Sequence, residues 1–167
     1  DKLIENGLYI LFIREGDVIP YNNYLAENLS EYLSHPDTKN EEKAAFAYNT
    51  IANIARGLFA QPTAESITSY KNAIKNTLKF ILREDDSISH LINLTRLDYT
   101  TYTHSINVGI FATGLMKALF TNGETHNLEE LAAGFFLHDI GKSTIPLKIL
   151  QKPGPLDSEE WTIMKGH

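Results

Sequence analysis

Two long segments in the first half of the chain place their apolar residues at helical spacing, and this pattern restricts the fold most. Between about residues 40 and 60, apolar side chains recur at steps of three and four residues: Ala44, Ala47, Ile51, Ile54, Ala55 and Leu58. A second stripe follows Thr63 and continues to about Leu82: Ile67, Ile74, Leu78 and Ile81. Each stripe forms one apolar helical face, so we expect a mainly α protein in which these helices pack as core or at a dimer interface.

Shorter patterns occupy the segment before these helices. Residues 7–21 predict a small β-hairpin, because β-branched and aromatic residues fill 8–13, turn-like residues follow, and Pro20 ends the returning strand. A helix is expected over about residues 23–33, where a proline-containing turn stops it. The N-terminal region is therefore predicted to combine a hairpin with a helix.

Capping signals mark helices in the second half. A short helix is expected from Ser87, and a long apolar helix should end near Phe120. Asn127 and Asp157 each precede a glutamate by three residues, which is the spacing of a capping box at a helix start. Pro146 suits the first turn of a brief helix between them.

Composition excludes several classes of protein. The chain has 167 residues, enough for one ordinary domain or two small ones, and 43% hydrophobic with 22% charged residues is typical of a soluble globular protein. No cysteine is present, which excludes disulfides and thiolate metal sites. A formal charge of −6 argues against binding to a nucleic-acid polymer, and no apolar run approaches the roughly 20 residues that span a bilayer.

One stretch concentrates polar groups directly after an apolar run. His138 and Asp139 end a predicted helix, and Lys142 follows Gly141, which should take a positive φ as the residue after a helix. A buried His-Asp pair is costly unless its charge is neutralised, and a metal ion accomplishes this with imidazole and carboxylate donors. The alternatives are an ordinary helix-end hydrogen bond or salt bridge, and a lysine that only faces water.

Two further histidines could join this pair. His104 shares a helical face with Val108 and Phe111 and is expected to point inward, either as a ligand or as a satisfied core residue. His167 shares a face of the last helix with Glu160, Ile163 and Met164. Three helices that each deliver an imidazole would form a metal site. The other histidines are expected to be a surface residue, a partly buried polar residue and a solvated loop residue: His35, His90 and His126.

Two glycines interrupt the helix of His104. Gly109 and Gly114 each cost about 1 kcal/mol relative to alanine inside a helix. We expect the close approach of another helix to explain them.

A longer string of motifs now points to a known family. The string consists of Thr103-His104-Ser105-x-Asn107-Val108, then Leu137-His138-Asp139-Ile140-Gly141-Lys142, then Ile145-Pro146, Ile149-Leu150, Lys152-Pro153-Gly154, Glu160, Met164 and His167. Over about residues 98–167 it resembles the HD-GYP subfamily of HD-domain phosphohydrolases. The resemblance implies an HD-domain helical bundle, and residues 1–86 carry no such match.

The resemblance also implies an activity and a set of site residues. It implies a bacterial cytoplasmic phosphodiesterase that hydrolyses cyclic di-GMP to linear pGpG or GMP. His104, His138, Asp139 and His167 match metal ligands of the family, and Lys142 matches the lysine near the scissile phosphate. Two iron or manganese ions about 3.5–4 Å apart would share a bridging hydroxide, with Asp139 able to bridge them.

One departure and one missing part qualify the match. Some members hold a third metal with a glutamate one turn before the first histidine; Thr100 stands there, so we predict two metals. The family's later paired histidines, a further aspartate and the Gly-Tyr-Pro loop would lie beyond His167, so we expect a domain truncated on its C-terminal side.

The predicted organisation has three parts. Residues 1–39 form a small N-terminal α/β region, 40–86 form linking or dimerising helices, and 87–167 form the HD-GYP-like domain. A homodimer through the N-terminal helices and partner signalling proteins are expected. Two alternatives to the phosphodiesterase stay open: a catalytically silent member that binds cyclic di-GMP or a protein, and an HD phosphohydrolase of another nucleotide.

Overall fold

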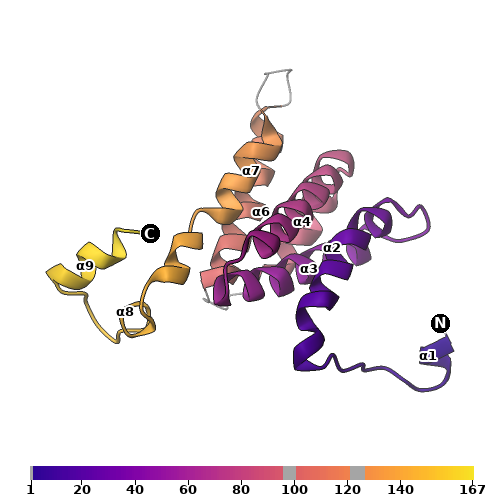
Figure 1. Cartoon of the computed structure of the whole chain (residues 1–167). Coiled ribbons are helices and arrows are strands. Elements are labelled where there is room, and N and C mark those ends of the chain that lie inside the picture. The colour runs from indigo at the N-terminus through magenta and orange to yellow at the C-terminus, as the bar shows by residue number, and fades with distance from the viewer. Residues whose placement is uncertain (1, 96–100, 121–126) are drawn as a thin grey trace.

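The computed structural model describes residues 2–95, 101–120 and 127–167, and this part of the chain contains helices and no strand (Figure 1). The α-helices are α1 (Lys2–Glu5), α2 (Val18–Ser34), α3 (Asn40–Ala60), α4 (Ala64–Arg83), α5 (Ser87–Leu94), α6 (Thr101–Leu119), α7 (Leu128–Leu137), α8 (Leu147–Leu150) and α9 (Ser158–Met164). Two 3-10 helices are η1 (Glu15–Asp17) and η2 (Ile140–Thr144). The predicted mainly α class is confirmed.

A bundle of six helices forms the core. Helices α2, α3 and α4 pack on one another, and α6 packs on α7. Helix α5 packs on both α3 and α6, and the contacts of α3 with α6 and of α4 with α7 also join the two groups. A single hydrophobic cluster extends through them, from Leu29 on α2 to Phe136 on α7. Helices α3 and α4 of the first half therefore support α6 and α7 by packing against them. The predicted division after residues 39 and 86, and the dimer, stay predictions.

The two apolar stripes are confirmed as core faces. Every predicted stripe residue of α3 is buried, and on α4 the same is true of Ile74, Leu78 and Ile81, while Ile67 is partly buried against the cluster. Thr63 caps α4 as expected, since its hydroxyl accepts from the Ser66 backbone N–H and the Ser66 hydroxyl accepts in return. This reciprocal cap satisfies two backbone donors that the helix leaves unpaired.

The predicted β-hairpin over residues 7–21 is wrong. Residues 8–13 are an irregular segment, with Phe12 91% exposed, and the chain enters α2 at Val18. A lone hairpin is marginally stable, whereas α2 buries one face against α3 and α4. Pro20 lies in the first turn of α2, where a missing backbone N–H leaves no intrahelical hydrogen bond unmade.

The last two helices lie to one side of the bundle (Figure 1). Asp157 begins α9 as predicted, accepting from the backbone N–H groups of Glu159 and Glu160, while the Glu160 carboxylate accepts from the Asp157 N–H. Among the described residues, no helix is both long enough and apolar enough to cross a membrane.

Candidate metal centre

Asp139 lies at the centre of the predicted site. It follows the end of α7, serves as the N-cap of η2, and is only 4% exposed. Its backbone carbonyl accepts from the Lys142 N–H at 2.9 Å, which begins the 3-10 turn. The sequence therefore changes from α7 to a tighter turn at the residue that carries the carboxylate, and this turn directs the carboxylate toward the bundle.

Four cationic or imidazole groups surround this carboxylate. Its Oδ2 lies 2.7 Å from Lys142 Nζ, 3.4 Å from His138 Nε2 and 3.9 Å from His104 Nε2. Its Oδ1 lies 3.7 Å from His167 Nε2. The structure thus brings together all five predicted site residues, which come from α6, the α7–η2 junction and the residues after α9.

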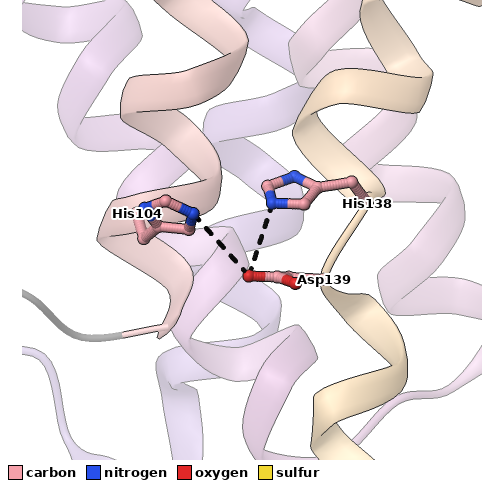
Figure 2. Close-up of side chains that lie close together, drawn as sticks. All are labelled: His104, His138 and Asp139. Carbon is pink, nitrogen blue, oxygen red and sulfur yellow. Dashed lines mark ion pairs between the residues drawn. The ribbon is translucent and has the colours of Figure 1, made fainter. Parts of the chain in front are cut away.

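Three of these residues have the geometry of a metal-ligand group. Ligand atoms of His104, His138 and Asp139 all lie within 4.8 Å of one another. Figure 2 shows both imidazoles directed at the same oxygen of Asp139. The two rings meet edge to face, with centroids 5.5 Å apart and planes inclined by 68°.

Two imidazoles are oriented by backbone carbonyls. His138 Nδ1 donates to the Phe135 carbonyl at 2.7 Å, and His167 Nδ1 donates to the Met164 carbonyl. A carbonyl oxygen can only accept, so a proton lies on Nδ1, and Nε2 is the ring nitrogen that faces Asp139 and could bind a metal ion. This second hydrogen bond is the usual arrangement of a metal-binding histidine. A divalent metal ion therefore fits the donor set.

Charge balance without a metal depends on Lys142. A buried ionised carboxylate requires an opposite charge or hydrogen bonds, and the ammonium at 2.7 Å supplies both. Lys142 keeps 27% of its side chain exposed, so it remains accessible to a ligand from solvent. Lys142 therefore does not only face water, and the His138-Asp139 contact considered as an alternative is present beside it at 3.4 Å.

Two glycines allow the elements of the site to approach. A Cβ built on Gly109 would lie 2.5 Å from ring atoms of Phe136, and one on Gly114 would lie 2.8 Å from Ile88. The prediction that these glycines allow close helix approach is confirmed. The first of them sets α6, the helix of His104, against α7, the helix that precedes His138.

Gly141 has a different purpose from the predicted one. Its φ is not positive, since among the described residues only Gly7 and Gly154 have positive φ values. A Cβ at Gly141 would lie 2.7 Å from the His167 carbonyl carbon and 2.8 Å from its Cα. The absence of a side chain at Gly141 makes room for the backbone of His167 beside η2. Glycine is therefore needed here for close approach and not for a positive φ.

The expected orientation of His104 also needs correction. Its side chain is 48% exposed, and Phe111 on the same face is 50% exposed, so this face does not enter the core. The buried face of α6 contains Ile106 and Ile110 instead. His104 lies at the rim of the bundle and reaches Asp139 from there.

The remaining predictions on this site have mixed outcomes. His35 is exposed, as expected. His90 is partly buried and lies 3.4 Å from Asp86, which confirms a polar role away from the site. His126 and Thr100 lie outside the described residues, so the prediction of two rather than three metals stays a prediction.

Comparison with known families finds a match in the second half of the chain. Residues 101–167 match the family described as HD domain. A solved structure, "Bd1817, a HDG"Y"P protein from Bdellovibrio bacteriovorus", superposes with a TM-score of 0.66 at 23% identity, covering 93% of this chain and 51% of that one. The HD-domain fold and the resemblance to HD-GYP proteins are thereby confirmed.

Two curated proteins are similar in sequence. One is the "Cyclic di-GMP phosphodiesterase PA4108" of Pseudomonas aeruginosa, 35% identical over 89 residues, or 52% of this chain and 20% of that protein. The other is the "3'3'-cGAMP-specific phosphodiesterase 2" of Vibrio cholerae, 61% identical over 31 residues, or 19% of this chain and 6% of that protein. The chain thus spans a small part of the length of either relative.

Proposed function

We propose that the intact protein is a metal-dependent phosphodiesterase that hydrolyses cyclic di-GMP to linear pGpG or GMP. The observation that carries this proposal is the convergence of three imidazoles and one ammonium on the buried carboxylate of Asp139. The similarity to PA4108, whose name gives this activity, supports the substrate.

His104, His138, Asp139 and His167 would hold two divalent metal ions, iron or manganese. When bound, such a pair supplies hydroxide at neutral pH and polarises a phosphoryl oxygen. Asp139 is suited to contribute to both metal ions, because Oδ2 faces His104 and His138 while Oδ1 faces His167. One oxygen could join the pair of imidazoles, and the other could join the single imidazole of His167.

Lys142 is the proposed phosphate-binding residue. Its ammonium is a compact charge beside the carboxylate and retains access to solvent. A phosphodiester approaching this rim would meet a fixed positive group where negative charge increases in the transition state. Its contact with Asp139 keeps the ammonium in place before substrate binds.

A second substrate is favoured by the Vibrio cholerae relative, which is named as specific for 3'3'-cGAMP. Both molecules are cyclic dinucleotides with two phosphodiester bonds, so one site chemistry serves either. Base recognition must distinguish them.

The test uses full-length protein loaded with iron or manganese and incubated with each cyclic dinucleotide, with products separated by chromatography. We expect linear dinucleotide or GMP to appear. Asp139→Asn should reduce turnover by about 100-fold or more, since loss of even an outer residue of a metal site costs 10–100-fold. Asp37→Asn, at an exposed carboxylate in the turn between α2 and α3, should leave turnover unchanged.

Other outcomes select the alternatives. Calorimetric binding of cyclic di-GMP without turnover by metal-loaded protein would identify a silent sensor. Absence of both binding and turnover, with metal shown to be present, would contradict the proposal and leave a protein-binding role or another nucleotide, which a substrate panel separates.

A further inference from the structure

Two buried tyrosines lie outside the matched HD segment and reach into it. Tyr48 on α3 is 5% exposed and Tyr70 on α4 is 0% exposed. Both occupy positions within the apolar stripes, four residues after Ala44 and three after Ile67. A tyrosine hydroxyl in a core needs a hydrogen-bond partner. The partners lie on α6, which carries His104, and on α7, which directly precedes His138.

Tyr70 fixes the end of α7. Its hydroxyl donates to the Phe136 carbonyl at 3.4 Å, and its burial raises the pKa of the phenol, which keeps this donor protonated. The last carbonyls of a helix have no intrahelical donor, so a side chain must satisfy them. The preceding carbonyl, of Phe135, accepts from His138. Two successive carbonyls are thus bonded to side chains, one from α4 and one from the proposed ligand.

Tyr48 makes the corresponding contact on α6. Its hydroxyl donates to Asn107 Oδ1 at 3.3 Å. Asn107 lies three residues after His104 on the same helix, so this bond fixes the turn that follows the proposed ligand. The contact of Phe136 with Gly109 then sets α6 against α7. Each of the two helices is therefore fixed both to its neighbour and to the N-terminal helices.

We propose that Tyr48 and Tyr70 are positioning residues of the metal centre, through which α3 and α4 set the separation of His104 from His138 and Asp139. This inference rests on the proposed metal-binding function. It assigns part of the centre to helices outside residues 101–167. A shift of α3 or α4 would then change metal binding without touching a ligand.

The experiment compares Tyr48→Phe, Tyr70→Phe and the double variant in the full chain. Cobalt(II) titration followed by its visible absorption reports both affinity and ligand geometry. Each single variant should bind cobalt about 3- to 10-fold more weakly. This is the change in affinity expected if the whole free energy of one hydrogen bond contributes to holding the metal ligands in place. The absorption band should also change shape, which a loss of global stability alone does not cause.

Two variants on α4 serve as matched controls. Thr77→Val removes a buried hydroxyl that has no hydrogen-bond partner among the described residues, and Ile74→Val removes a buried methylene. Both should retain wild-type cobalt affinity and spectrum, whatever their melting temperatures.

Three results would overturn the inference. Tyrosine variants that bind cobalt with wild-type affinity and spectrum would show that the hydroxyls do not position the centre. An equal loss in Ile74→Val would show that affinity only follows stability. A wild-type protein that binds no cobalt, iron or manganese would refute the proposed centre itself, which separates that failure from the first two.

Discussion

Replacing Gly109 by alanine should destabilise the fold, although alanine is the better helix former. A Cβ at this position would lie 2.5, 2.5 and 2.6 Å from three ring atoms of Phe136. The Phe136 ring is fully buried in a close-packed core, so its rotation would displace neighbouring side chains. Helix α6 must therefore move away from α7, or the ring must leave its preferred rotamer.

The magnitude follows from two opposing terms. Alanine in place of glycine inside a helix gains about 1 kcal/mol. Overpacking a core costs about 1–3 kcal/mol, and three contacts far below van der Waals distance place Gly109 near the upper end. The expected net change in the free energy of unfolding is a loss of about 1–2 kcal/mol. The sign is opposite to that predicted by helix propensity alone.

Gly134 provides the matched control. It lies on α7, is exposed, and a Cβ there would meet nothing within 4 Å. Gly134→Ala should therefore gain about 0.4–1 kcal/mol. Urea unfolding followed by circular dichroism measures both variants, and unchanged m-values confirm that the transitions are comparable. A Gly109→Ala protein as stable as wild type would refute the packing of α6 on α7 described above.

A double-mutant cycle identifies the responsible contact. Phe136→Leu replaces the ring that opposes Gly109 with a smaller side chain. The loss of unfolding free energy caused by Gly109→Ala should therefore be smaller in that background than in wild type. A coupling of 0.5–3 kcal/mol is the range found for residues in contact. Additive effects would show that the strain arises elsewhere.

Two further predictions concern the second half of the chain. Gly141→Ala should displace the backbone of His167 and weaken metal binding. Urea stability should change little, because the displaced residues after α9 lie outside the hydrophobic cluster. Equal affinity in a cobalt titration would contradict this prediction. The backbone N–H of Glu160 donates to the Asp157 carboxylate and lowers its pKa, so the Asp157 cap stabilises α9 above the unfolded-state pKa of Asp and is lost as pH falls below about 4. Amide exchange in α9 should therefore increase below that pH. Asp157→Asn should remove this pH dependence.

The sequence by itself determined the helices and several of their ends. Apolar spacing on α3 and α4 depends on residues three and four positions apart, and the Thr63 and Asp157 caps depend on residues within one turn. These are local relations, so they can be read without a fold. The motif string also identified the segment that matches the HD-domain family, Asp139, and the four residues that converge on it, although their roles remain proposals.

Sequence patterns gave wrong predictions where the structure of a segment depends on residues far away in the chain. The run of β-branched and aromatic residues at 8–13 indicated a strand, but a strand is stable only when it pairs with others. In the structure this run stays exposed, and the chain that follows it forms α2, which buries one face in the core. The same limit affected His104, since apolar residues on its face suggested burial while the opposite face of α6 packs into the bundle.

Only the tertiary structure decided what the glycines and tyrosines do. Gly141 makes room for the His167 backbone, which lies 26 positions further along the chain, and Tyr70 bonds a carbonyl 66 residues away. Neither separation follows a helical period, so no pattern in the chain signals the contact. The packing of α4 on α7 and of η2 on the segment after α9 brings these atoms together, because the bundle must bury its apolar faces and satisfy its buried polar groups at the same time.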